Sequence, residues 1–415
     1  MRWMWRELTR PRGPTVHRFY RVGRGSRAGV ALLMAITAIM MLTVLVTEVS
    51  HGAQVRAQVA AQHRDEIAAE ALAQSGAQFY RMILMASAAL SGKPMIEQLG
   101  AAFGVNASEL WQALPFIDTS LMRLLFVTDG DVGEGEVLTA KAEGLSDEQR
   151  DASRESSSLL NRSFLDFHGD FHAEVTDVER RVFVGKLQAA NLGELLALPA
   201  AQEIIGLLSR EEYHSWLSEN NLIKEELVAN LADWTDADDV RLYQGGSEDS
   251  VYQRLDDPYR SKNAPFDTRD EIRLVDGWNL DGVWERAGRH LTIYGGGKIN
   301  VNTATQPVIR ALLVAFAEGV ATEATVEPIL QELMTQRGTP LAEGGLYFKT
   351  PQQFTSVLRT LGLPLRSEIN QAITTESKVF RIHSSGQVGS ARAEIHAVLD
   401  FTEDPTGRVV FWRLR

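Results

Sequence analysis

The chain contains no cysteine, so neither a disulfide framework nor a thiolate metal site is possible. It also lacks the Gly-x-Ser-x-Gly, P-loop and Rossmann fingerprints. Its histidines are scattered; His168 and His172 are four apart in an expected strand and have no third ligand on the same element, which argues against zinc. The sequence therefore predicts a protein that is not an enzyme.

Charge is missing from the 18 residues between Val30 and Thr47. A helix of that length would span about 27 Å, close to the thickness of a bilayer hydrocarbon core. A signal-peptide core is usually about 7–15 residues long and is followed by a small-residue cleavage site, which this sequence does not have. We therefore interpret residues 30–48 as a transmembrane helix.

Proline is absent from the residues that follow, which are rich in Ala, Gln and Glu up to about Leu90. The sequence predicts one helix of about 60 residues, with residues 49–91 as its extension beyond the membrane. Gly52 and Gly76 are the weak points of this helix. The simplest alternative is a one-pass anchor with a helical stalk and no processing.

Positive charge is concentrated at the N-terminus. Residues 1–29 hold eight arginines and one acid, Glu7, a net +7, which leaves −19 on the rest of a chain of net charge −12. Such an acidic body argues against nucleic acid as the main partner. The positive-inside rule places the N-terminus in the cytoplasm and the body across the membrane.

Strands are predicted at both ends of the remaining body. "SKVFRIHSSGQVG", "ARAEIHAVLDF" and "RVVFWRLR" alternate apolar and polar residues between turn signals. "FHGDFHAEVTDVERRVFVGKL" predicts a hairpin that turns at Asp177 to Arg180. The sheet, from residues 167–187 and 377–415, would bracket a mainly helical domain over 188–376, with residues 92–166 as an insertion of unknown role. The expected class is α+β, a long N-terminal helix packed on an antiparallel sheet with a large inserted α-domain.

Acidic residues are dense between Asp233 and Asp257, where two arginines, Arg241 and Arg254, oppose eight acids. The acids are Asp233, Asp236, Asp238, Asp239, Glu248, Asp249, Asp256 and Asp257. Alternating carboxylates on a glycine-containing loop supply the oxygen ligands that Ca²⁺ prefers, although the spacing is not that of an EF-hand. The alternative, which the residues alone favour, is a solvated acidic loop.

The stretch "INVNTATQPVIRALL" also has two interpretations. It resembles half of a DNA-binding helix-hairpin-helix, but the residues after it are acidic and lack a second glycine-rich turn. It also fits an ordinary helix start with Thr305 as N-cap, which puts Pro307 in the permissive first turn. We favour the helix start.

The junction before the apolar segment, Arg24 to Gly29, resembles the leader of type IV prepilins and pseudopilins. The resemblance implies cleavage by a prepilin peptidase between Gly29 and Val30, with the apolar helix as the new N-terminus. Most members carry Glu at the fifth mature position, where this chain has Met34. The K-type pseudopilins of the type II secretion system also lack that glutamate, which is thought to pair with the neighbouring subunit's amine.

Four further motifs resemble the K-type minor pseudopilin family. They are Asp-Trp-x-Asp-x-Asp (Asp233 to Asp238), Asp-Pro-Tyr-Arg (Asp257 to Arg260), Glu-x-Arg-Leu-Val (Glu271 to Val275) and Asn-Val-Asn-Thr-Ala (Asn300 to Ala304). The resemblance covers about Gly29 to Arg415, except residues 92–166. It implies the pseudopilin fold, and a calcium ion in the acidic region. Its expected ligands are Asp236, Asp238, Glu248 and Asp249.

The resemblance also implies a function. The expected protein is a minor pseudopilin at the tip of the type II secretion pseudopilus, which helps to initiate that fibre and to export folded proteins. Expected partners are the I-type and J-type minor pseudopilins, the major pseudopilin, the inner-membrane assembly platform and the prepilin peptidase. It would cross the bacterial inner membrane once, with its body in the periplasm. The alternative function is a membrane-anchored periplasmic protein for DNA uptake or hydrolysis.

Overall fold

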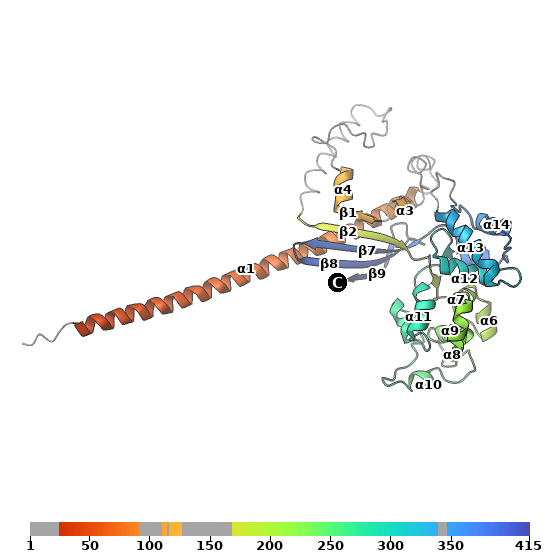
Figure 1. The fold of residues 1–415 in the computed structure, drawn as a ribbon, viewed down its shortest axis with the longest axis horizontal. Helices are drawn as coiled ribbons and strands as arrows, with labels where there is room; N and C mark the ends of the chain where they lie inside the picture. The colour runs from red at the N-terminus through yellow and green to blue at the C-terminus, as the bar shows by residue number, and fades with distance from the viewer. Residues whose placement is uncertain (1–24, 91–109, 114–115, 127–167, 339–346) are drawn as a thin grey trace, which may run out of the picture. The chain divides into compact units, whose positions relative to one another are not determined.

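The computed structural model describes residues 25–90, 110–113, 116–126, 168–338 and 347–415 (Figure 1). The chain divides into two units, residues 1–64 and 65–415. The N-terminal helix α1 (Gly25–Leu90) is continuous over 66 residues, as the absence of proline predicts. Most of the predicted leader lies outside the described residues.

The first unit contains the apolar part of α1. Among the described residues, this helix alone is long and apolar enough to cross a membrane, with a mean hydropathy of 2.6 in its most apolar window. The hydroxyls of Thr37, Thr43 and Thr47 donate to carbonyls one turn back in the helix, at 2.7–3.0 Å. These hydroxyls therefore need no outside partner in lipid.

The second unit is built on a five-stranded antiparallel sheet in the order β1-β2-β7-β8-β9. The strands are β1 (Phe116–Asp118), β2 (Asp170–Asp177), β7 (Val379–Val388), β8 (Ala391–Asp400) and β9 (Arg408–Leu414). They lie side by side in Figure 1. The three predicted C-terminal strands are present; β7 and β8 alternate in burial, whereas β9 is exposed along almost its whole length.

The second half of α1 packs on this sheet through small side chains. Its buried face repeats every three or four residues and consists of Ala69, Leu72, Ala73, Ala77, Tyr80 and Leu84. A Cβ on Gly386 of β7 would lie 2.1 Å from the carbonyl oxygen of Ala69, and one on Gly76 would lie 2.4 Å from Ser384 Oγ. Gly76, a predicted weak point of the helix, is thus one of two glycines that allow the helix and the sheet to approach closely.

Part of the predicted insertion belongs to the same layer. Helices α3 (Leu110–Ala113) and α4 (Thr119–Phe126) flank β1, which pairs with β2. Trp111, Ile117 and Met122 are buried in the core between α1 and the sheet. The remainder of residues 92–166 lies outside the described residues.

The predicted hairpin around Asp177 is wrong. Strand β3 (Val182–Phe183) does not return to β2 but pairs in parallel with β4 (Leu291–Thr292). The alternation of apolar and polar residues led to the wrong partner because Val182 and Val184 bury their side chains in the helical domain and not on the sheet. The chain leaves the sheet after Asp177 and re-enters it at Val379.

The residues between β2 and β7 form the mainly helical domain, beyond the ends of those strands in Figure 1. Its elements are α6 (Leu192–Ala197), α7 (Pro199–Leu207), α8 (Glu211–Glu219), α9 (Lys224–Asp233), α10 (Asp249–Tyr252), η2 (Arg269–Leu274), α11 (Asp281–Arg286), η3 (Gly288–His290), β5 (Ile299–Asn300), α12 (Gln306–Phe316), α13 (Glu323–Gly338), α14 (Pro351–Thr360), α15 (Ile369–Ala372) and β6 (Ile373–Thr374). β5 and β6 pair in parallel.

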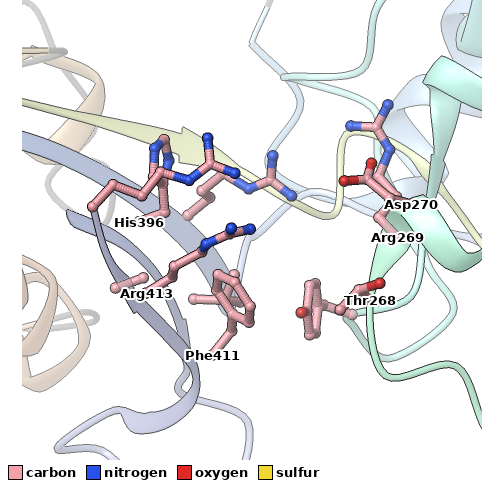
Figure 2. Close-up of a pocket in the computed structure, with 11 residues that line it drawn as sticks. Thr268, Arg269, Asp270, His396, Phe411 and Arg413 are labelled. Carbon is pink, nitrogen blue, oxygen red and sulfur yellow. The ribbon is translucent and has the colours of Figure 1, made fainter. Parts of the chain in front are cut away.

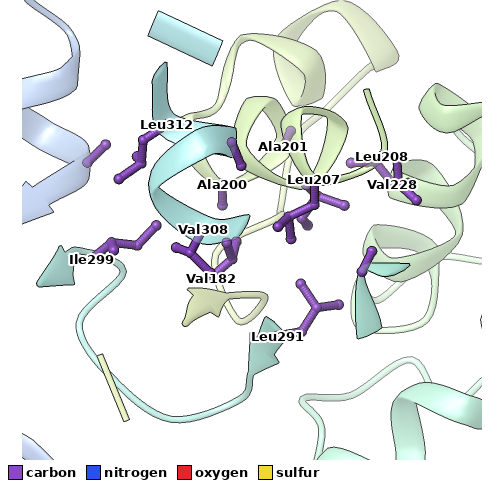
Figure 3. Close-up of a cluster of buried hydrophobic side chains, with 14 of the residues drawn as sticks. Val182, Ala200, Ala201, Leu207, Leu208, Val228, Leu291, Ile299, Val308 and Leu312 are labelled. Atoms are coloured by element: carbon purple, nitrogen blue, oxygen red, sulfur yellow. The ribbon is translucent and has the colours of Figure 1, made fainter. Parts of the chain in front are cut away.

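The core of this domain is the crossing of α7 and α12 (Figure 3). Ala200, Ala201 and Leu207 of α7 face Val308 and Leu312 of α12 in this cluster. Gly206 allows the close approach, since a Cβ there would lie 2.6 Å from the Ala311 carbonyl oxygen. The helices are held by apolar packing.

Candidate functional site

The acidic segment forms a closed loop after α9. Asp233 is the last residue of that helix, and Glu248 directly precedes α10. Val240 and Ser247 form an antiparallel bridge, and Gly245 and Gly246 make the turn between them with positive φ. The bridge brings the two ends of the acidic segment together.

Three carboxylates converge at the base of this loop. One oxygen each of Asp233, Asp236 and Glu248 lie within 4.8 Å of one another. Asp233 and Glu248 are almost fully buried, at 4% and 2% exposure. Asp233 Oδ2, Asp236 Oδ1 and both Glu248 carboxylate oxygens are buried without a hydrogen-bond partner. Such carboxylates are costly unless a cation or a proton neutralises them.

The pKa values of the three carboxyl groups are raised for the same reason. Burial raises the pKa of Glu248 to about 8, and neighbouring carboxylates add to the effect. Burial likewise raises the pKa of Asp233 to about 7 and that of Asp236 to about 6. Converging carboxylate oxygens with no protein donor fit a hard divalent cation such as Ca²⁺, so the residues present match the implied metal.

The structure brings together two of the four expected ligands, Asp236 and Glu248, and adds Asp233. Asp238 is exposed and its Oδ1 accepts from the Val240 amide at 2.8 Å. Asp249 Oδ1 accepts from the Ser261 amide at 3.0 Å, and Asp249 is not among the converging carboxylates. The i, i+3 spacing of Asp233 and Asp236 at a helix end could have indicated this pair.

The motifs of the sequence meet beside the carboxylates. Trp234 packs edge-on against Tyr252, with ring centroids 5.3 Å apart, and Tyr252 stacks on Tyr259 at 5.2 Å. Trp234 Nε1 donates to Glu271 Oε1 at 3.1 Å, and Tyr259 Oη donates to the Leu274 carbonyl at 2.6 Å. Segments about 40 residues apart thus form one wall behind the acidic loop.

The Asn-Val-Asn-Thr-Ala segment faces inward. The Asn302 side chain links two segments that are far apart in the sequence. It donates to the carbonyls of Phe348 and Thr375 and accepts from the Phe348 amide, at 2.9–3.0 Å. Asn300 Nδ2 donates to Ser377 Oγ at 2.6 Å. Thr305 is the N-cap residue of α12, as predicted. These amides are used for internal bonds, which does not favour the DNA-binding alternative.

The same segment joins the helical domain to the sheet. Asp177, the last residue of β2, is buried and accepts from the hydroxyls of Thr303 and Ser377. Burial raises its pKa despite these bonds. Glu179 Oε2 accepts from the Lys378 amide at 2.7 Å, and burial raises the Glu179 pKa to about 7. The junction is therefore a buried polar network.

The expected processing residues lie at the start of α1. Gly29 and Val30 are helical and exposed, and a Cβ on Gly29 would meet no described atom within 4 Å apart from its chain neighbours and its own helix backbone. Met34, at the fifth mature position, is 69% exposed.

One comparison with known proteins falls within the helical domain. Residues 197–296 match the family model of the type II secretion system (T2SS), protein K. A type II secretion system protein K from Klebsiella pneumoniae is 27% identical over 171 residues, which cover 41% of this chain and half of that relative's length. Residues 197–296 are therefore similar to the protein K domain of the type II secretion system.

A solved structure, the GspK–GspI–GspJ complex from the type 2 secretion system of enterotoxigenic Escherichia coli, contains a chain similar to this one. The two are 18% identical, with a TM-score of 0.44 over 65% of this chain and 95% of that one. The family match covers the acidic loop and the aromatic wall, so three of the four quoted motifs lie inside it, whereas Asn300 to Ala304 follows its last residue.

Proposed function

We propose that this chain is the K-type minor pseudopilin at the tip of a type II secretion pseudopilus, where it helps to initiate the fibre and to export folded proteins. The observation that carries the proposal is the protein K domain at residues 197–296 in a chain that begins with an apolar helix. The role is structural and not enzymatic, since its steps are helix insertion and subunit packing. The body would lie in the periplasm and the leader in the cytoplasm.

The proposed maturation is cleavage between Gly29 and Val30 by a prepilin peptidase. Removal of the arginine-rich leader would leave Val30 as the N-terminus of an uncharged helix. That helix would leave the lipid and pack among the helices of other pseudopilins. Because Met34 offers no carboxylate for a neighbouring amine, the subunit would begin a fibre and not repeat along it.

The helical domain supports the tip position. It is inserted between β2 and β7 and is larger than the sheet that carries it. A domain of this size on every subunit would obstruct stacking along a fibre, whereas one copy at the end obstructs nothing. The polar network at Asp177 fixes its attachment to the sheet.

Strand β9 offers a surface for the I-type or J-type partner. It is an edge strand of the sheet, and its Val409, Val410, Trp412 and Leu414 side chains are 40–43% exposed. An exposed apolar edge strand is suited to pairing with another chain. We place the contact with a sister minor pseudopilin at this edge.

We also propose that Asp233, Asp236 and Glu248 hold a calcium ion. When bound, the ion would neutralise three converging carboxylates and thereby stabilise the loop. The loop is closed, independently of the ion, by the backbone bridge between Val240 and Ser247.

Co-purification tests the proposal. The full chain, tagged and co-expressed with the I-type and J-type pseudopilins, should purify with both. Trp412→Asp should reduce their recovery severalfold, whereas Val320→Asp, at a residue 90% exposed on the helical domain, should not. A full chain that purifies without either partner from such cells would contradict the proposal.

A further inference from the structure

A cavity of about 270 Å³ lies between the sheet and the helical domain. Figure 2 shows His396 and Arg413 from the strands on one side and Thr268, Arg269 and Asp270 on the other. Four arginines line it, Arg269, Arg381, Arg413 and Arg415, whereas Asp270 is the one acidic side chain of the lining. The side chains therefore give the cavity a strong positive charge in a chain of net charge −12.

These arginines lack the partners that arginines have elsewhere in the domain. Within the described residues, none of the four side chains makes an ion pair or a hydrogen bond, and Arg269 Nε is buried without an acceptor. By contrast, Arg310 pairs with Glu323 and Glu327 at 3.3 and 3.1 Å. Arg269 and Arg381 are half-buried with no protein acceptor, whereas Arg413 and Arg415 are exposed to solvent.

The geometry keeps the positive charges together. Alternation along β7 puts Arg381 on the sheet face opposite α1, because Ile382 and Ser384 face the helix. His396 of β8 is directly opposite Arg413 of β9. Across the cavity, the Arg269 guanidinium lies 5.1 Å from the centre of the Trp284 ring. An aromatic ring and not an acid holds Arg269 in place.

The positive charge of these arginines lowers the pKa values of neighbouring basic groups. Burial and the charges of Arg269 and Arg381 lower the pKa of the adjacent Arg181 to about 9. Burial, Arg289, Arg181 and Arg269 lower the pKa of His290 to about 4. Like charges crowded and partly desolvated without acceptors are unfavourable, and a bound anion would relieve them.

A metal ion fits this region less well. His383, Glu394 and His396 bring one ligand atom each within 4.8 Å of one another, beside the cavity. However, Arg381, Arg413 and Arg415 line the same cavity as His396 and would repel a dication. Guanidinium groups instead match the oxygens of a phosphate, to which they donate in pairs.

We propose that this cavity binds a phosphate group through Arg269, Arg381 and Arg413. The inference is independent of the pseudopilin proposal, since it concerns a small anion and not a partner chain. The phosphate could be free in solution or belong to an anionic lipid headgroup.

Thermal unfolding of the full chain in a non-ionic detergent tests the site. Inorganic phosphate should raise the melting temperature saturably at constant ionic strength, where chloride does not. The Arg269→Gln and Arg381→Gln variants should lose at least about tenfold in phosphate affinity, the effect of one lost charge-assisted bond. Arg359→Gln, on an exposed face of α14 away from the cavity, is the matched control and should bind as the wild type does.

The variants also separate binding from folding. If the cavity is an anion site, Arg269→Gln should unfold at the same or a higher temperature than the wild type in phosphate-free buffer, since it removes repulsion. Short-chain phosphatidylglycerol below its micelle concentration, compared with phosphatidylcholine, tells the sources apart: competition with phosphate assigns a headgroup, and no competition assigns free phosphate. No saturable phosphate effect, or an effect unchanged in both arginine variants, would overturn the proposal.

Discussion

At the scale of single residues, buried carboxylates without partners separate into two kinds. Asp233, Asp236 and Glu248 face one another, and a shared cation would satisfy them together. Glu203 of α7 is 2% exposed and stands apart from that cluster, with Oε1 unpaired. Burial raises the pKa of Glu203 well above its ordinary value. Burial thus favours the protonated form of this side chain in the folded protein.

Replacement of Glu203 by Gln should make stability less dependent on pH. Because the folded-state pKa lies above the unfolded one, the folded wild type keeps a proton that the unfolded chain loses, so its stability falls as pH rises above about 4.3. The loss is at most about 1.4 kcal/mol per pH unit. The melting temperature of Glu203→Gln should therefore exceed that of the wild type by more at pH 8 than at pH 5. Parallel curves for the two proteins would contradict this assignment.

The carboxylate cluster makes a prediction that distinguishes the two ligand sets. Calcium should raise the melting temperature of the full chain, and a chelator should lower it. Asp233→Asn should abolish most of the calcium effect, because Asp233 belongs to the converging set. Asp238→Asn should keep the effect, since its carboxylate caps the Val240 amide outside the set.

The reverse pattern, with Asp238 needed and Asp233 dispensable, would restore the set expected from the sequence. The sequence showed that the loop is acidic, but the choice of ligands depends on the bridge between Val240 and Ser247. A contact of that kind has no local signal in a single sequence. Asp249 illustrates the difficulty, since its acceptor is used by an amide 12 residues away.

At the scale of elements, glycine sets how closely α1 approaches the sheet and how closely α7 approaches α12. Gly386 sits opposite the Ala69 carbonyl, and Gly206 sits opposite the Ala311 carbonyl. A backbone carbonyl cannot rotate away as a side chain can. Both close crossings therefore require the absence of a Cβ.

Substitution of Gly386 by Ala should separate α1 from the sheet. The added Cβ would lie 2.1 Å from the Ala69 oxygen, so the strand or the helix must shift. We expect a loss of about 1–3 kcal/mol, as for other overpacked cores, seen as a lower melting temperature and faster proteolysis. Gly52→Ala is the control, since its nearest neighbour is Arg56 Nη2 at 3.6 Å, and it should be neutral or slightly stabilising. Equal melting temperatures for the two variants would refute the close crossing.

Local pattern predicted the elements whose partners are near in sequence. Strands β7, β8 and β9 follow one another as hairpins, and their alternation and turns were sufficient to predict them. Strand β3 was misassigned because its partner β4 lies about 110 residues away. Alternation indicates a strand with one buried face, but it does not say which sheet provides that face.

At the scale of the whole molecule, the proposed function depends on the order of the parts. An apolar helix comes first, a sheet packs on its second half, and a protein K domain is inserted between two strands of that sheet. Charge, periodicity and proline content predicted the helix, the C-terminal strands and the helical domain. The contribution of β1 to the sheet could not be predicted, because three residues are too few for a periodic signal.

The proposed role requires the apolar helix to become the N-terminus of the mature protein. N-terminal sequencing of the membrane-bound chain, from cells that contain the prepilin peptidase, measures this directly. We predict that the sequence begins at Val30, and that Gly29→Val leaves the leader attached. A wild-type chain that begins at Met1 in those cells would show a simple membrane anchor and would contradict the assignment of this protein to the tip of a pseudopilus.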